Sequence, residues 1–174
     1  MNSAPPETSR ALDRVDFKIL RLLQEDATLS VADVANQVGL SSTPCWKRIQ
    51  RLQMEGVITG RVALVDQDKI GLGLSVFVFI ESGDHSKEWQ TSFAATLKAM
   101  PQIVDMYRLA CDFDYVLRVV VPDMKSFDQF YRTLIGAAAL KNVTSRFAME
   151  KIKSVTALPI ASAEHARSPA GVSA

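Results

Sequence analysis

The sequence predicts an α+β protein whose two parts differ in the spacing of their apolar residues. Up to about Gly56, apolar residues recur at helical spacing. From about Gly71, runs rich in β-branched and aromatic residues alternate with helical segments. The 174 residues, 48% of them hydrophobic and 22% charged, are enough for two small folded domains. We expect domains at residues 12–60 and 71–160, a hinge strand or linker at 61–70, a disordered tail at 1–11 and a mobile tail at 161–174.

The first domain begins with two short amphipathic helices. Asp13 can cap the first helix, whose apolar positions are Val15, Ile19, Leu20 and Leu23. Ser30 can cap the second helix, because Asp33 follows three residues later as in a capping box. Gly39, which readily adopts a left-handed backbone, is predicted to end this helix.

A third helix is predicted to start at Pro44, with Thr43 as its cap, and to end before Gly56. Its apolar face comprises Cys45, Ile49 and Leu52. Its outer face, which is polar, aromatic and basic, comprises Thr43, Trp46, Lys47, Gln50 and Arg51. A recognition helix in the DNA major groove needs this mixture, so the candidate DNA-binding residues are Ser42, Thr43, Trp46, Lys47, Arg48 and Arg51. An ordinary helical hairpin with a solvated basic face fits the same spacing. The next segment, VITGRVALVD, is predicted to form a short hairpin or wing.

Charge and cysteine content narrow the class of protein. The net charge is only +1, but residues 41–61 hold four basic residues against Glu55. Cys45 and Cys111 are too few and too far apart for a disulfide framework or a zinc site, and they fit a reducing cytoplasm. No stretch has the length of a signal peptide core or a membrane span. We expect a cytoplasmic, nucleoid-associated protein with no cofactor, metal or membrane partner.

The second domain is predicted to follow the order βαββαβ. Its elements are a strand at 74–81, a helix at 87–100, a hairpin of strands at 103–110 and 115–121, a helix capped by Asp123, and a strand at about 143–156. This order is the ferredoxin-like plan, a four-stranded antiparallel sheet with both helices on one face. The bare face would expose Phe77 and Phe79, so we expect pairing of two sheets in a homodimer at least.

Several segments resemble the Lrp/AsnC family of transcription regulators. LDRVDFKILRLLQEDATLS, VANQVGLSSTPCWKRIQRLQMEGVI and TGRVALVD resemble its winged helix-turn-helix, and MPQIVDMYRLACDFDYVLRVVVPDMKSFDQFY and VTSRFAMEKIKSVTALPI resemble its effector-binding and oligomerisation domain. The resemblance covers about residues 12–160. It implies a regulator that binds double-stranded DNA, responds to an amino-acid effector and assembles from dimers into an octamer or another higher oligomer.

The resemblance also implies an effector site at a contact between dimers. The family's turn usually reads Gly-Asp-Phe/Tyr-Asp-Tyr, whereas this chain has Cys111 in place of the glycine. The implied effector residues are Tyr107, Asp112, Asp114, Met124 and Phe147. Asp114 is the first choice to accept from the ammonium group of the ligand. Ordinary hairpin aspartates and core side chains are the alternative for all five.

TPCWKRIQRL, GRVALVDQDKIGLGL and HSKEW resemble a subgroup of the family linked to sulfur amino acids and cysteine detoxification. Two other functions fit parts of the pattern: an architectural protein that coats DNA, and a small ferredoxin-like enzyme. No Ser/His/Asp or Cys/His arrangement, phosphate loop or metal-ligand spacing can be assembled from the sequence, so we expect no catalytic residues.

Overall fold

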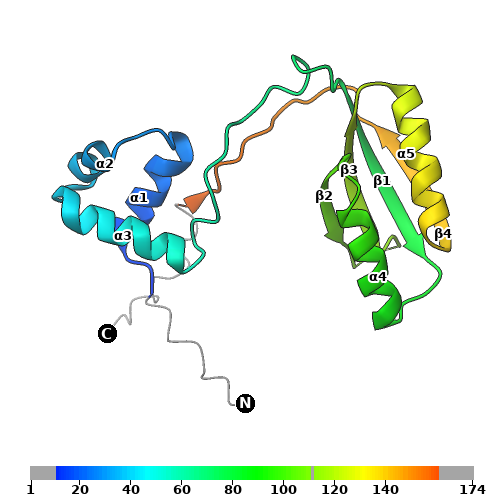
Figure 1. The fold of residues 1–174 in the computed structure, drawn as a ribbon, viewed down its shortest axis with the longest axis horizontal. Coiled ribbons are helices and arrows are strands. Elements are labelled where there is room, and N and C mark those ends of the chain that lie inside the picture. The colour runs from blue at the N-terminus through cyan, green and yellow to red at the C-terminus, as the bar shows by residue number, and fades with distance from the viewer. Residues whose placement is uncertain (1–10, 111, 161–174) are drawn as a thin grey trace, which may run out of the picture. The chain divides into compact units, whose positions relative to one another are not determined.

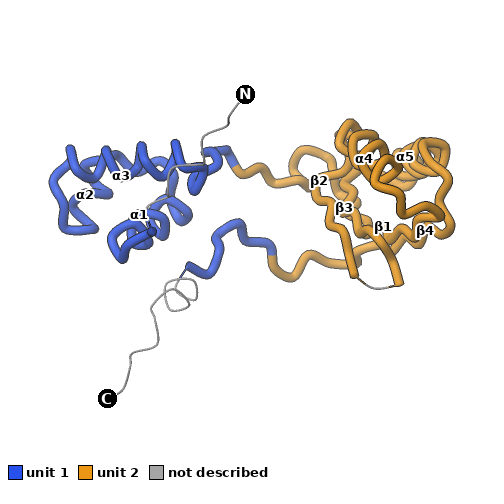
Figure 2. The backbone as a smooth tube through the Cα atoms, turned by 90° about the horizontal axis from the view of Figure 1, so that it is seen from below, with its two compact units in different colours: residues 1–63, 154–174 blue, residues 64–153 orange. Residues whose placement is uncertain are grey.

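The computed structural model describes residues 11–110 and 112–160, which divide into two compact units (Figure 2). Within the described residues, unit 1 comprises residues 11–63 and 154–160, and unit 2 comprises residues 64–153. The predicted tails, except for residue 11, and Cys111 lie outside the described residues. Unit 1 is therefore built from two stretches of sequence that are separated by the whole of unit 2.

Unit 1 contains helices α1 (Arg14–Glu25), α2 (Val31–Val38) and α3 (Ser42–Met54) (Figure 1). The predicted caps of α1 and α2 are confirmed. Asp13 accepts hydrogen bonds from the backbone N–H groups of Val15 and Asp16, and Ser30 accepts from that of Asp33. In both boxes the acidic side chain at the third helical position accepts in turn from the cap residue's N–H. Gly39 ends α2 at φ 74°, as predicted.

The core of unit 1 is a cluster of buried side chains from all three helices. It comprises Ile19, Val34, Ala35, Val38, Cys45, Ile49 and Leu52. Helix α1 adds partly buried side chains that pack against Ile19 and its neighbours, so the cluster holds the three helices in one bundle.

The predicted start of the third helix is wrong by two residues. Helix α3 begins at Ser42, and its cap residue, Ser41, makes no side-chain capping bond. The backbone N–H of Cys45 donates to the carbonyl of Ser41 at 3.3 Å, so helical bonding already includes Ser41. Pro44 then occupies the third helical position, where the missing N–H also leaves no intrahelical bond unmade.

The predicted wing is not formed in the structure. Residues 57–66 contain no strand: the chain is extended through Val65, and a turn follows from Gln67 to Gly71. In that turn, Leu72 N–H donates to Gln67 C=O and the Asp66 carboxylate accepts from two backbone N–H groups. An isolated two-stranded ribbon has too little apolar burial to be stable by itself, which accounts for the extended segment.

Unit 2 contains β1 (Leu74–Ser82), α4 (Lys87–Lys98), β2 (Ile103–Arg108), β3 (Tyr115–Val121), α5 (Met124–Ala137) and β4 (Leu140–Phe147). The strands form one sheet in the order β2-β3-β1-β4, with every neighbouring pair antiparallel. Alternate residues of β1 and β3 are buried with the apolar faces of α4 and α5, so the helices cover one face of the sheet. The predicted βαββαβ ferredoxin-like plan is confirmed.

The last strand differs most from its prediction, because it runs from Leu140 to Phe147 rather than from about 143 to 156. Pairing with β1 decides both ends. Leu140 pairs with Ser82 across a register shift, and the last bond runs from Ala148 N–H to the carbonyl of Ser75, next to the start of β1. Only Leu74 of β1 lies beyond Ser75, so the chain after Ala148 has almost no strand left with which to pair.

Candidate nucleic-acid interface and ligand turn

The exposed face of α3 begins at its first turn. Ser42, Thr43 and Lys47 are exposed, and half of the surface of Trp46 is accessible, while Cys45, Ile49 and Leu52 lie in the core. Two hydroxyl residues, an indole and an ammonium group therefore share one side of the N-terminal half of the helix. Such side chains can donate to phosphates and base edges in a DNA groove.

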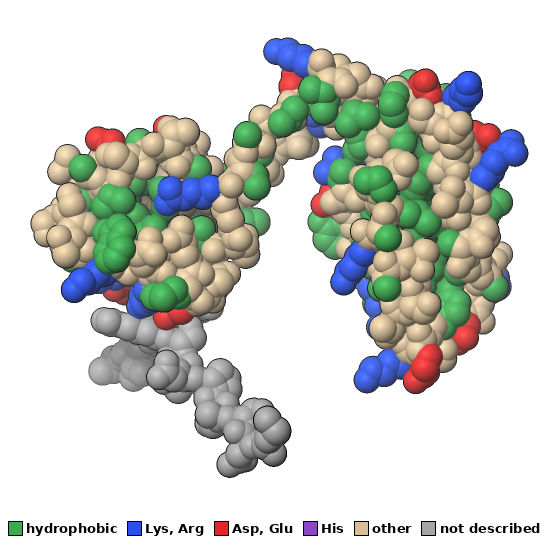
Figure 3. Space-filling view, in the orientation of Figure 1, with side chains coloured by type: hydrophobic (Ala, Val, Ile, Leu, Met, Phe, Trp, Pro, Cys, Tyr) green, Lys and Arg blue, Asp and Glu red, His purple; other side chains and the backbone are tan. Residues whose placement is uncertain are grey.

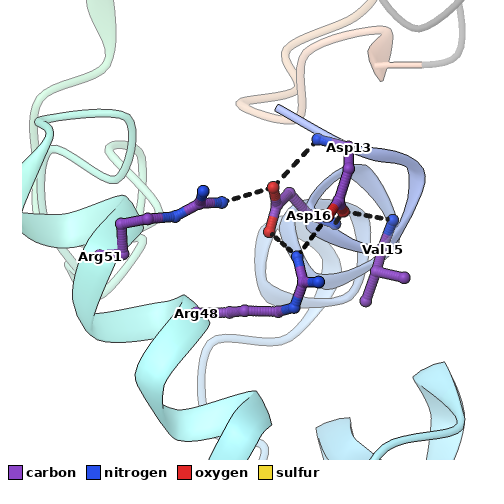
Figure 4. A network of polar contacts seen from close by, with 5 residues as sticks. All are labelled: Asp13, Val15, Asp16, Arg48 and Arg51. Carbon is purple, nitrogen blue, oxygen red and sulfur yellow. Dashed lines mark hydrogen bonds and ion pairs between the residues drawn. The ribbon is translucent and has the colours of Figure 1, made fainter. Parts of the chain in front are cut away.

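Arg48 and Arg51 do not belong to this outer face. The Arg48 guanidinium donates to Asp13 Oδ2 at 2.6 Å and to Asp16 Oδ1 at 2.8 Å, and Arg51 donates to Asp16 Oδ2 at 2.5 Å (Figure 4). Both arginine side chains are mostly buried, at 27% and 20% exposed. The prediction that Arg51 points away from the bundle is therefore wrong, because both arginines reach along the helix flank to α1.

Electrostatics follows the same geometry. Burial tends to raise the pKa of Asp13, but the backbone N–H of Asp16 and the Arg48 guanidinium outweigh it and hold the pKa of Asp13 below its ordinary value. The hydrogen bonds from Arg48 to Asp13 and Asp16 raise the pKa of Arg48. Two of the four basic groups in residues 41–61 are thus paired with Asp13, the cap of α1, and Asp16 in its first turn. On the visible face of unit 1, Lys and Arg side chains stand apart from one another (Figure 3).

The second candidate site is the turn between β2 and β3. Asp114 Oδ2 accepts the backbone N–H and the hydroxyl of Ser82, each at 2.7 Å, and Ser82 is only 4% exposed. The hydrogen bonds from Ser82 lower the pKa of Asp114, with smaller contributions from His85 and Arg108. Asp114 Oδ1 lies 3.6 Å from His85 Nδ1. Oδ2 is therefore occupied within the fold, and Oδ1 is the oxygen that faces a polar, partly exposed position.

The predicted effector residues do not form one cluster within a chain. Asp112 and Asp114 lie at the end of the sheet where β1 finishes. Phe147 pairs with Val76 near the start of β1, and Met124 begins α5 just after β3 ends at the same side of the sheet. Ser82 lies six positions along β1 from Val76, which is about 20 Å of strand. Tyr107 lies between these positions on β2 and is 61% exposed.

The face of the sheet opposite the helices is partly apolar. Phe77 is exposed, and the ring of Phe79 lies 5.5 Å from that of Phe113 and 5.7 Å from the Arg146 guanidinium carbon. Across the strands, Phe77 pairs in register with Arg118, which donates to Asp105 at 2.5 Å. An aromatic patch bordered by charge is typical of a surface that a partner covers.

A cavity of about 410 Å³ lies elsewhere in unit 2. Its lining comprises Met100, Gln102, Val121, Pro122, Ser126, Gln129, Phe130 and Thr133. These side chains offer amides and hydroxyls but no charge, whereas an amino acid brings an ammonium and a carboxylate group. The Asp114 turn therefore remains the better candidate for such a ligand.

Sequence reasoning missed Asp16 and Ser82, the partners that fix the two sites. Asp16 interrupts an apolar helix pattern, which is a signal for a buried ion pair. The pattern does not show which basic residue pairs with Asp16. Ser82 follows an apolar strand and carries no comparable signal. Within the described residues, no group of three or more His, Cys, Asp or Glu side chains is placed to hold a metal ion, and no helix is long and apolar enough to cross a membrane.

Two family models match the chain. Residues 12–59 match the winged helix-turn-helix DNA-binding model, and residues 75–158 match the Lrp/AsnC ligand binding domain. The DNA-binding transcriptional activator DecR of Escherichia coli (strain K12) is 49% identical over 150 residues, which cover 86% of this chain and 99% of DecR. The glutamate uptake regulatory protein of Zymomonas mobilis is 42% identical over 151 residues, which cover 87% and 92%.

Solved structures agree with these matches. The crystal structure of an AsnC family transcriptional regulator from Agrobacterium tumefaciens has a TM-score of 0.83 and 50% identity, and the match covers 87% of this chain and 99% of that one. A transcriptional regulator from Neisseria meningitidis, solved as a complex with L-methionine, has a TM-score of 0.81 and 30% identity, with 86% and 97% covered. The chain described here therefore belongs to the Lrp/AsnC family and is a DNA-binding transcriptional regulator.

Proposed function

We propose that this regulator reads double-stranded DNA with the exposed face of α3, namely Ser42, Thr43, Trp46 and Lys47. The observation that carries the proposal is the gathering of hydroxyl, indole and ammonium groups on the exposed N-terminal half of a helix whose other face is in the core. Hydroxyl residues allow close approach to the groove, and Lys47 supplies the charge for a phosphate or a guanine edge. Arg48 and Arg51 instead bind Asp13 and Asp16 and so hold α3 against α1.

We also propose that an amino-acid effector changes the assembly or the DNA binding of the protein, which then controls genes of amino-acid metabolism. The Asp112–Asp114 turn is the proposed ligand site, with Asp114 Oδ1 accepting from the ammonium group. The complex of the Neisseria meningitidis relative with L-methionine supports this class of ligand. Cysteine is the first amino acid to test, because of the sequence resemblance to regulators linked to cysteine detoxification.

The effector site is proposed to need more than one copy of the chain. Met124 and Phe147 lie at the other end of the sheet from Asp114, so they can complete the site only from a neighbouring copy. The exposed aromatic face around Phe77 and Phe79 supports a homodimer through paired sheets. Further contacts between dimers would then build an octamer or another closed ring.

The test is DNA binding by the purified protein to its own upstream region and to an unrelated fragment, at two salt concentrations, with and without a panel of amino acids including cysteine. Lys47→Ala is expected to weaken binding and to reduce the salt slope by about one unit. Lys98→Ala, which removes one exposed charge from unit 2, is the matched control and should leave binding unchanged. Uniform, strongly salt-dependent coating of both fragments would favour an architectural protein instead.

A further inference from the structure

A buried carboxylate joins α1 to the proposed recognition helix. Asp16 is 0% exposed, and its two oxygens accept three hydrogen bonds, from Asp13 N–H, Arg48 and Arg51. Asp13 accepts from the N–H groups of α1 through Oδ1 and from Arg48 through Oδ2. Figure 4 shows both guanidinium groups reaching from α3 to this pair of carboxylates. The network therefore links the start of α1 to two positions, three residues apart, on one flank of α3.

Apolar packing fixes the rotation of α3 about its own axis less sharply than directional bonds do. The contacts of Cys45, Ile49 and Leu52 are close-packed but non-directional. Two charge-assisted bonds to one carboxylate are directional, and Arg48 and Arg51, three residues apart, hold α3 at two points nearly one turn apart. A rotation that moved Lys47 would stretch both bonds together.

We propose that Asp16, assisted by Asp13, is a positioning residue for DNA recognition. It acts through Arg48 and Arg51 to set the rotation of α3, and so determines where Trp46 and Lys47 enter the groove. This inference rests on the proposed role of α3 as the recognition helix. It assigns to two acidic residues of α1 a positive contribution to DNA binding, and it removes Arg48 and Arg51 from the set of direct contacts.

Simple electrostatics predicts the opposite effect of neutralising Asp16 on DNA affinity. The direction of the measured change in affinity therefore decides between the two explanations. A carboxylate close to DNA repels phosphates, so neutralising Asp16 would release the Arg51 guanidinium for phosphate contact and leave Arg48 with Asp13 as its only carboxylate partner. Affinity would then rise and the dependence of log K on log salt would become steeper. If Asp16 positions the helix, the same change weakens specific binding and leaves the salt slope as it was.

The experiment measures binding of the full-length protein to its upstream region and to an unrelated fragment over a range of salt concentrations. Asp16→Asn keeps the shape and one acceptor oxygen. We expect the preference for the specific fragment to fall by about tenfold or more, as for the loss of a good base contact, with an unchanged salt slope. Asp33→Asn, which removes an exposed carboxylate of the same unit without touching α3, is the matched control and should keep full preference.

A second variant keeps the inference testable if Asp16→Asn fails to fold. Asp13→Ser retains a good helix cap but removes one of the two carboxylates that Arg48 contacts, so a smaller loss of preference at constant slope is expected. Unchanged or tighter binding by the folded variants, or a steeper salt slope, would overturn the proposal. Failure of Lys47→Ala to change the slope would refute the role of α3 itself, and that result is distinguishable from either outcome for Asp16.

Discussion

Replacing Asp114 separates its structural role from its proposed ligand role. In Asp114→Ala, the backbone N–H of Ser82 loses its acceptor in a residue that is 4% exposed, and the hydroxyl loses the same oxygen. An unsatisfied buried donor costs about 1–3 kcal/mol, and bonds to a charged group lie at the upper end of this range. We expect the free energy of unfolding of unit 2 to fall by about 3 kcal/mol. Asp114→Asn keeps an acceptor oxygen and should lose about 1 kcal/mol.

The pH dependence provides the check on this reasoning. The pKa of Asp114 is lowered from its ordinary value of 3.8, so the carboxylate contributes stability that is fully present above the unfolded pKa. That contribution is lost as the pH falls through the lower, folded pKa. The free energy of unfolding of Asp114→Ala should lie below that of wild type by a constant amount at pH 5 to 7, and this difference should shrink below about pH 4. Denaturant unfolding at fixed protein concentration, with hydrogen exchange of peptides that span residues 80–85, measures it.

The same two variants also test separately whether Asp114 stabilises the fold and whether it binds the effector. Asp114→Asn should remain folded and lose the response to the effector, since the ligand ammonium loses its anionic partner. An Asp114→Ala variant that unfolds with wild-type stability, within about 0.5 kcal/mol, would refute the structural argument. An Asp114→Asn variant with a full effector response would refute the assignment of the ligand site.

Four other perturbations test the fold and the assembly. Gly39→Ala should destabilise unit 1 by about 1–2 kcal/mol in thermal unfolding, because the residue has φ 74° although an added Cβ meets no atom within 4 Å; unchanged stability would contradict this. Leu117→Ala, at a fully buried site of β3, should cost about 3–5 kcal/mol by denaturant unfolding, whereas a loss below 1 kcal/mol would mean that the core is looser than described. Phe77→Asp should reduce the mass measured by sedimentation if paired sheets form the dimer, and an unaltered mass would place the interface elsewhere. The thiol of Cys45, whose pKa burial raises, should react with a thiol reagent much more slowly in the folded protein than in urea; equal rates would show that the core of unit 1 opens readily.

Local chemistry made the helix caps predictable. Asp13, Ser30 and Asp123 act on N–H groups two or three residues away, so the sequence around each of them contains the whole interaction. Phe77 and Phe79 were likewise assigned correctly to the face that the helices leave bare, because residues two apart on a strand share a face whatever its partner strands are. These elements were predicted at or within a few residues of their observed positions.

Pairings between distant segments were not predictable in this way. Helical spacing assigned Arg51 to the outer face, because it does not show that α1 places the carboxylate of Asp16 beside Arg48 and Arg51, 32 and 35 positions earlier in the chain. Ser82 and Asp114 are separated by 32 positions, and their contact arises only when β1 and β3 pair. The end of β4 depends on where β1 begins. In each case the decisive partner is chosen by the tertiary fold.

The divided sequence of unit 1 has a consequence for exchanging parts between relatives. The side-chain amide of Gln24 in α1 accepts from the N–H of Leu158 at 2.7 Å and donates to its carbonyl at 3.3 Å. Leu158 is also the last residue that matches the ligand-binding model. A chimera with one junction after Ala63 takes the whole chain after that residue from a relative. The relative's segment would then pack against Gln24 of the original α1. An exchange with two junctions, after residues 63 and 153, transfers the sensing unit and leaves the DNA-reading unit with its own returning segment.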